Sequence, residues 1–209
     1  MAGWTGKLHR RFRSLKDKAY TLLWYRFLFY RIGSRCSLAS PLYTYRPDRI
    51  EIGHGVSFGP ACRLETYPDE RQASGRGAML KIGNQVRLEH RVMISCLSSV
   101  ILEDDVLVAS GCYISDNNHS IDPEGPRYAE QPPRGAPTRI GKGVWLGQNV
   151  CVLAGSTIGE RSVIGAGSIV KGEIPPYSLA VGSPARVVKR YCFETKRWVK
   201  AEVQEAVPV

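Results

Sequence analysis

The chain has 209 residues, 43% of them hydrophobic, which is enough for one domain of ordinary size with a sizeable core. Its net charge is +10, and residues 1–35 supply most of it, with nine Lys and Arg against a single acid, Asp17. The six cysteines form no CxxC or CxxH pair, which argues against a zinc site. With no signal peptide in view, we expect a reducing, cytoplasmic location.

A basic amphipathic helix is predicted over residues 5–32, within an N-terminal segment of residues 1–40. The apolar side chains recur at spacings of three and four: Leu8, Phe12, Leu15, Ala19, Leu22, Leu23 and Phe27. The apolar stretch is too short to cross a bilayer. Two interpretations stay open. The apolar face caps the end of a repeat structure, or it lies on an anionic membrane surface, peripheral on the inner face.

Six-residue repeats fill residues 41–190. The clearest run has an aliphatic residue opening each hexad and a small or β-branched residue four places later; the openers are Ile140, Leu146, Val152, Ile158, Ile164 and Val170. Glycine follows the opener in four hexads, where we expect it to supply backbone freedom at a corner. Cys62 and Cys112 fall at the small position. Period six predicts an all-β fold, a parallel β-helix of four to five coils, with each opener stacked along the axis.

Two segments break this register. Residues 65–79 form the first loop and residues 115–138 the second, which leaves the coil and returns to it in register. The second loop contains Asp116, His119 and Asp122. A loop of this length inside a compact domain is usually functional or disordered, so it is a candidate site on a stiff frame. After Pro176 the pattern ends, and residues 191–209 are expected to hold a short helix over 191–203 and a frayed tail.

These motifs carry a resemblance. Trp145-Leu-Gly, Ile164-Gly-Ala-Gly-Ser-Ile-Val, Ile174-Pro-Pro and Gly182-Ser-Pro-Ala-Arg-Val-Val resemble the C-terminal signature of the hexapeptide-repeat acyltransferases. The most similar branch is that of the galactoside, maltose and polysaccharide O-acetyltransferases. The resemblance implies a left-handed coil, a homotrimer, acetyl-CoA as the donor and no metal. Handedness comes from the resemblance and not from the period, since parallel crossovers are otherwise right-handed.

His119 is the candidate catalytic residue, because the family's catalytic histidine lies in this same loop. Transfer of an acetyl group to a hydroxyl needs a base, and a neutral imidazole with an ordinary pKa of about 6.5 suits the task. Asp116, Asp122 or a backbone carbonyl would orient the ring, and Asp116 is also a candidate for substrate binding. His54 and His90 share the third hexad position and are expected on the surface, as is His9 in the basic helix.

The remaining site residues come from the resemblance. Trp145 would line the acceptor side, Gln148 and Ala166 would flank the pantetheine of coenzyme A, and its phosphates would meet the cations Lys171, Arg186 and Lys189. The chain departs from galactoside-type members in having Lys171-Gly-Glu in place of Thr-Lys-Asp, and no asparagine in Ile94-Ser-Cys-Leu. A galactoside acceptor is therefore disfavoured, and a sugar of a polysaccharide or lipopolysaccharide is expected.

Other functions stay open at this point. An antibiotic-modifying O-acetyltransferase would share much of the same signature. A non-catalytic β-helix scaffold, or a zinc-dependent relative, would need no acetyl donor. A nucleic-acid binder would fit the basic helix, but no recognised motif accompanies it and the coil has no basic stripe.

Overall fold

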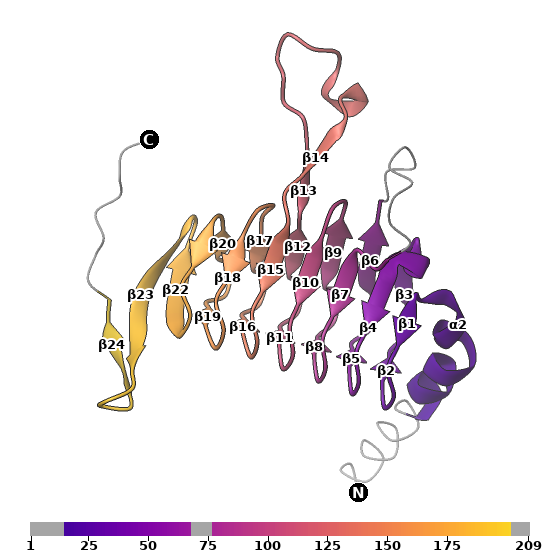
Figure 1. The fold of residues 1–209 in the computed structure, drawn as a ribbon, viewed down its shortest axis with the longest axis horizontal. Coiled ribbons are helices and arrows are strands. Elements are labelled where there is room, and N and C mark those ends of the chain that lie inside the picture. The colour runs from indigo at the N-terminus through magenta and orange to yellow at the C-terminus, as the bar shows by residue number, and fades with distance from the viewer. Residues whose placement is uncertain (1–14, 68–76, 202–209) are drawn as a thin grey trace, which may run out of the picture.

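Short strands wind around one axis into a straight prism with three sides (Figure 1). The computed structural model describes residues 15–67 and 77–201. Most of the first expected loop, His9 and the first part of the expected basic helix lie outside these residues. Successive strands join the three sheets in turn, so one coil contributes one strand to each, and all neighbours within the coils are parallel. The fold is the expected left-handed parallel β-helix.

The strands of each side share one sheet. Sheet A contains β1 (Arg31–Ile32), β4 (Ile50–Ile52), β7 (Leu80–Ile82), β10 (Val100–Leu102), β15 (Thr138–Ile140), β18 (Thr157–Ile158) and β21 (Glu173–Ile174). Sheet B contains β2 (Ser37–Leu38), β5 (Ser57–Phe58), β8 (Arg87–Leu88), β11 (Leu107–Val108), β16 (Trp145–Leu146), β19 (Val163–Ile164), β22 (Ser178–Gly182), β23 (Ala185–Cys192) and β24 (Arg197–Lys200). Sheet C contains β3 (Leu42–Tyr45), β6 (Cys62–Thr66), β9 (Met93–Cys96), β12 (Tyr113–Ser115), β17 (Cys151–Val152) and β20 (Ile169–Val170).

The hexad openers form the core, as the sequence predicted. Ile140, Ile158 and Ile174 stack in register along sheet A, each at most 4% exposed. The small position is equally buried, including Cys62 and Cys112. Burying one such aliphatic side chain contributes about 1.5–3 kcal/mol, so the repeated openers dominate the stability of the coil.

Glycine at the second hexad position has a different role from the expected one. A Cβ on Gly147 would lie 2.7 Å from the backbone nitrogen of Ala166 in the next coil, and one on Gly159 would lie 2.3 Å from that of Pro176. These glycines therefore permit close approach between coils. The positive φ angle of the corner falls two residues later, on Gly143, Asn149 and Gly155 for example.

The coil begins earlier than expected. Residues 5–32 were predicted to be helical, but the described helix ends at Leu28, and β1 and β2 already pair with β4 and β5 inside the expected N-terminal segment. Sheet A has seven strands, so the prediction of four to five coils was too low. The dense aromatic residues before Arg31 hid the start of the repeat. A short 3₁₀ turn, η2 (Pro47–Arg49), then leads into β4.

Residues 15–28 are helical, including η1 (Thr21–Tyr25) and α2 (Arg26–Leu28), and lie at the amino-terminal end of the prism (Figure 1). Phe29 joins the core, and Tyr25 packs against it. The Thr21 hydroxyl oxygen accepts a hydrogen bond of 3.0 Å from the Leu38 N–H. The helix thus covers the end of the coil, but the capping interpretation chose the wrong face, because Leu22, Leu23 and Phe27 are exposed. Among the described residues, no helix is long and apolar enough to span a membrane.

The expected C-terminal helix over residues 191–203 is wrong. β23 and β24 instead form an antiparallel hairpin that extends sheet B beyond the last coil (Figure 1). The chain reverses through Lys196, which has a φ of 54°, and Tyr191 packs edge-on against Trp198 across the hairpin at 5.6 Å. These aromatic cross-strand contacts favour strands over a helix. Residues 202–209, including the expected frayed tail, lie outside the described residues.

Candidate active site

The second loop, here called the arm (residues 116–137), projects sideways from the prism (Figure 1). It leaves sheet C after β12 and returns to sheet A at β15, so its base lies on the corner between sheets C and A. Two antiparallel strands form the stalk of the arm, β13 (Asn117–His119) and β14 (Pro133–Gly135), and η3 (Tyr128–Glu130) lies near its tip.

Asp116 fastens the base of the arm to the preceding coil. Its side chain is fully buried, and the two carboxylate oxygens accept hydrogen bonds of 2.6–2.7 Å from the N–H groups of Leu97, Ser98 and Ser99. The Asn117 amide adds a fourth bond at 3.1 Å. Three backbone donors around one carboxylate form an anion nest. The expected roles of Asp116 in substrate binding and in orienting His119 do not fit this burial, and the residue acts as an anchor.

Gln131 holds the outer part of the arm together. It is 4% exposed, and its side-chain amide nitrogen donates to the carbonyl oxygens of Asp122 and Pro126, both at 2.8 Å. Its amide oxygen accepts from the Asp122 N–H at 3.0 Å. The Asp122 carboxylate caps its own turn by accepting from the Glu124 N–H at 3.0 Å. The arm is therefore an ordered platform, and the contact of the Asp122 carboxylate lies within the arm itself.

His119 ends β13, and its side chain is exposed on the stalk of the arm. Its backbone N–H donates to the Asn118 side-chain oxygen at 3.0 Å. Within residues 15–67 and 77–201, no group forms a hydrogen bond with the His119 ring. The ring is accordingly open to a substrate or to a neighbouring molecule. His54 and His90 are also exposed, as expected, and their Nδ1 atoms contact the hydroxyl groups of Ser34 and Ser110 in adjacent coils.

The outer face of sheet B carries a continuous row of side chains. Cα register places the following residues in one line across five strand pairs: Leu107, Trp145, Val163, Leu179, Lys189 and Lys200. Trp145 is 49% exposed, and both lysines are exposed. The row is thus apolar from Leu107 to Leu179 and cationic on the hairpin, and beyond Leu107 the same line continues to Arg87. Arg186 lies on the same outer face, opposite Val181.

Gln148 and Ala166 border this row on the corner between sheets B and C. They follow β16 and β19, and the Gly167 N–H donates to the Gln148 carbonyl oxygen at 2.8 Å, which sets the two residues side by side on adjacent coils. Five of the expected coenzyme A or acceptor residues therefore meet around one face: Trp145, Gln148, Ala166, Arg186 and Lys189. The sequence reasoning missed Lys200, although it shares the row with Lys189.

Lys171 and His119 lie elsewhere. Lys171 follows β20 on the corner between sheets C and A, the same corner that bears the arm. In a three-sided prism this corner is opposite sheet B. One copy of the chain therefore does not bring His119 next to Trp145, Gln148 or Ala166. This separation could have been predicted by counting hexads from the arm, because successive hexads contribute strands to sheets A, B and C in a fixed order.

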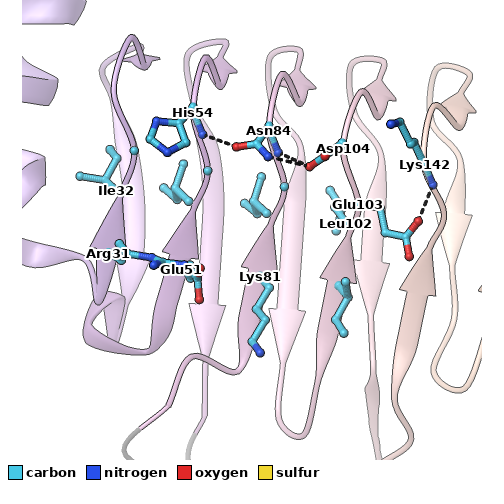
Figure 2. Close-up of a pocket in the computed structure, with 16 residues that line it drawn as sticks. Arg31, Ile32, Glu51, His54, Lys81, Asn84, Leu102, Glu103, Asp104 and Lys142 are labelled. Atoms are coloured by element: carbon cyan, nitrogen blue, oxygen red, sulfur yellow. Dashed lines mark hydrogen bonds and ion pairs between the residues drawn. The ribbon is translucent and has the colours of Figure 1, made fainter.

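A surface groove of about 760 Å³ runs along the corner between sheets A and B, and none of the expected site residues lines it (Figure 2). A hydrogen-bond ladder runs through it, in which the His54 N–H donates to the Asn84 side-chain oxygen at 2.9 Å and the Asn84 N–H donates to Asp104 at 2.6 Å. Glu51 pairs with Arg31, and the Lys142 N–H donates to Glu103. These polar groups link neighbouring coils, so we assign them a role in stabilising this corner of the prism.

Among the described residues, no group of three or more His, Cys, Asp or Glu side chains is placed to hold a metal ion. All six cysteines are free thiols. Burial raises the pKa of both Cys62 and Cys112 from 9.0 to about 11, so these thiols are protonated and inert at neutral pH.

Comparison with known proteins agrees with the fold. Residues 137–172 match the model of the bacterial transferase hexapeptide family (six repeats). An Escherichia coli K12 protein that carries the name lipopolysaccharide biosynthesis O-acetyl transferase WbbJ is 35% identical over 168 residues, which cover 77% of this chain and 82% of that protein. Rv3034c of Mycobacterium tuberculosis, named as an acetyltransferase, is 31% identical over 98% of this chain and 77% of its own length.

A solved structure of galactoside acetyltransferase in complex with coenzyme A superposes with a TM-score of 0.54 and 27% identity, covering 85% of this chain and 75% of that one. Its coils and those of this chain share one architecture. The chain belongs to the hexapeptide-repeat transferase family, and within it to the acetyltransferases.

Proposed function

We propose that the protein transfers the acetyl group of acetyl-CoA to a hydroxyl of a sugar in polysaccharide or lipopolysaccharide biosynthesis, with His119 as the general base. The observation that carries the proposal is the pairing of two features in one chain: an ordered arm that exposes an imidazole, and a straight face that is apolar from Leu107 to Leu179 and leads to the cations of the hairpin. The name of the E. coli relative supports a lipopolysaccharide acceptor.

The donor lies along the row on sheet B. Coenzyme A has an apolar pantetheine arm and a charged nucleotide end, and the row presents Trp145, Val163 and Leu179 before Lys189 and Lys200. With strands about 4.8 Å apart, Trp145 and Lys200 are roughly 19 Å apart along the face. Charge-assisted bonds from these lysines and Arg186 would hold the phosphates. Lys171, on the opposite corner, is outside this path unless a second copy supplies it.

His119 supplies the base. One ring nitrogen takes the proton of the acceptor hydroxyl as its oxygen attacks the thioester carbonyl carbon, and the C–S bond then breaks, releasing coenzyme A as the thiol with that proton. Base catalysis of this kind contributes about 10²–10⁴-fold. Since Asp116 and Asp122 are committed to the arm itself, a backbone carbonyl is the remaining group to orient the second ring nitrogen. Backbone N–H groups of the coil would hold the oxyanion.

The complete site needs more than one copy of the chain, because the arm lies opposite the face that binds the donor. A closed ring of three copies, as the resemblance implies, lets every copy give one arm and one face. The outward residues support such contact. Sheet C has a row of partly buried apolar side chains, Met93, Tyr113, Cys151 and Ile169, whereas sheet A is charged and carries the Arg31–Glu51 and Arg139–Glu103 ion pairs.

The proposal includes a cytoplasmic location, since acetyl-CoA is made in the cytoplasm and a reducing compartment suits the free thiols of this chain. The amino-terminal helix would hold the enzyme at the inner face of the membrane, close to sugars on lipid carriers.

The test incubates the purified protein with acetyl-CoA and a glycolipid extract of the host membranes. Release of the coenzyme A thiol and gain of alkali-labile acetyl mass on a glycan are followed together. His119→Ala should lower both rates by about 10²–10⁴-fold. His54→Ala is the matched control, since His54 is also exposed but lies on the corner between sheets A and B, and it should retain activity.

Three results would decide against the proposal. Near-normal turnover by His119→Ala would show that His119 is not the general base. Acetyl transfer to a hydroxyl of an antibiotic, with none to glycans, would favour the antibiotic-modifying alternative. An absence of coenzyme A release with every acceptor would favour a scaffold.

A further inference from the structure

The amino-terminal helix turns its largest apolar side chains away from the protein. Thr21, Tyr25 and Phe29 recur every fourth residue and face the coil, with Thr21 4% and Phe29 6% exposed. On the other side Phe27 is 80% exposed and Leu23 74%. The hydrogen bond from the Leu38 N–H to the Thr21 hydroxyl fixes this rotation of the helix. The exposed face is therefore a stable feature of the fold.

The exposed apolar side chains gather on one helix. Tyr20, Leu23, Trp24 and Phe27 lie in or beside the π-helical segment η1 (Thr21–Tyr25), and each is at least 48% exposed, whereas Thr21 and Phe29 are buried. Leu15 and Leu22 are exposed on the same helix. A contiguous apolar patch with aromatic residues marks an interaction site in a soluble protein. We call Tyr20, Leu23, Trp24 and Phe27 the end stripe.

The charges around the end stripe select its partner. Lys16, Lys18 and Arg26 are exposed on the same helix, and Asp17 is the only acid in residues 1–35 against nine cations. A second copy docked end to end would bring two strongly cationic segments together, which is unfavourable. An anionic bilayer satisfies both features, since basic residues bind its head groups while Trp, Phe and Leu enter the boundary with the acyl chains.

The place of the helix also sets the orientation of the prism. The helix covers the amino-terminal end of the coil, and the arm leaves the prism sideways three strand steps further along sheet C, after β12 (Figure 1). At about 4.8 Å for each step, plus half the thickness of a helix, the base of the arm is roughly 20 Å from the helix axis. A helix lying in the membrane plane would hold the prism upright and the arm parallel to the surface.

We infer that the end stripe docks the enzyme upright on anionic membranes, so that His119 acts on sugars held roughly 20 Å from the lipid surface. This inference rests on the proposed function for the identity of the acceptor, and it deepens it by naming the class: a membrane-linked glycan modified away from its lipid end. A soluble glycan of the same sequence would still be a substrate, but without the advantage of a shared surface.

Docking is tested by flotation of the full chain with two kinds of vesicle, phosphatidylcholine alone and phosphatidylcholine mixed with phosphatidylglycerol. The protein should bind the anionic vesicles at low salt and be released by added salt. Trp24→Ser with Phe27→Ser should weaken this binding about tenfold or more. Ile121→Ser is the control, because Ile121 is 78% exposed but lies on the arm. Equal binding to both vesicles, or unchanged binding by the double variant, would overturn the inference.

Orientation is tested by quenching of tryptophan fluorescence with brominated lipids. Trp24 should lie within reach of the bromine and Trp145, on sheet B, should not. The experiment uses a Trp4→Phe background, because Trp4 belongs to the same N-terminal segment. In that background, adding Trp24→Phe should abolish most of the quenching, while adding Trp145→Phe should leave the amount of fluorescence lost to quenching unchanged. Loss of quenching in Trp145→Phe would show a prism lying on its side. Neither experiment uses acetyl transfer, so failure of docking and failure of the proposed reaction are read separately.

Discussion

The carboxylate of Asp116 accepts a hydrogen bond of 2.6 Å from the backbone N–H of Ser99, in the preceding coil. Asp116 is three residues before His119, and it is fully buried at the point where the arm leaves the prism. The N–H groups of Leu97 and Ser98 complete the contact at 2.7 Å. The position of the imidazole is thus set by a carboxylate that does not touch it. Asp116 is a positioning residue in this account.

Asp116→Asn should lower kcat while leaving the KM for acetyl-CoA unchanged. The substituted amide nitrogen would face backbone donors, so the base of the arm would shift, whereas the face of sheet B would not. The lost charge-assisted bonds should also cost about 1–3 kcal/mol in the free energy of unfolding. Steady-state kinetics and urea unfolding measure the two effects.

Asp122→Asn is the control, since the Asp122 carboxylate makes one exposed contact within the arm, to the Glu124 N–H. If Asp116→Asn lowered the amount of folded protein but the folded fraction had normal kinetics, Asp116 would stabilise the fold and have no part in positioning His119.

The cationic end of the sheet B row gives a separate prediction. Lys189→Ala and Lys200→Ala should each raise the KM for acetyl-CoA, together by about tenfold or more at low salt, because each removes a charge-assisted contact with a phosphate. The kcat should stay the same. Lys81→Ala is the matched control, since Lys81 is exposed on the outer face of sheet A. An unchanged KM in the double variant would place the nucleotide elsewhere.

The core of this fold could be predicted from the sequence because it is determined within each hexad. Each opener, such as Ile140 or Val152, must point to the axis once the hexad is a strand and a corner, and no distant residue alters that. The hairpin of β23 and β24 was missed for the opposite reason. It depends on the cross-strand contact of Tyr191 with Trp198 and on a turn through Lys196, where no glycine marks the positive φ.

The sequence identified the residues of the candidate site better than it predicted their positions on the prism. His119, Trp145, Gln148 and Ala166 were chosen from motifs, but a motif does not tell which corner of the prism a residue occupies. Counting hexads in threes would have separated Lys171 from Ala166 and aligned Trp145 with Val163, eighteen residues later. The anchoring role of Asp116 was hidden, because its three donors come from backbone N–H groups.

Buried thiols predict how stability depends on alkaline pH. Burial raises the pKa of Cys62 and Cys112 to about 11 from an ordinary 9.0. Below pH 9 both states of the protein hold these protons, and the stabilisation is fully present. Between pH 9 and 11 the unfolded chain loses them first, so the free energy of unfolding should fall by about 1.4 kcal/mol per pH unit for each thiol.

Urea unfolding across this pH range, compared with Cys62→Ala and Cys112→Ala, isolates the effect. Each variant should flatten the alkaline slope, while Cys151→Ala, altered on the outer side of sheet C, should keep it. Equal slopes in all four proteins would contradict the assignment.

The most direct test of the account is complementation between two inactive variants. His119→Ala removes the base and leaves the donor face intact, whereas Ala166→Trp blocks the donor face and leaves the arm intact. When the two chains are expressed together and assemble at random, about one site in four combines an intact arm with an intact donor face. About a quarter of the wild-type acetyl transfer rate should therefore return. A mixture no more active than either variant alone would contradict a site shared between copies, with His119 of one copy acting on the thioester bound to the next.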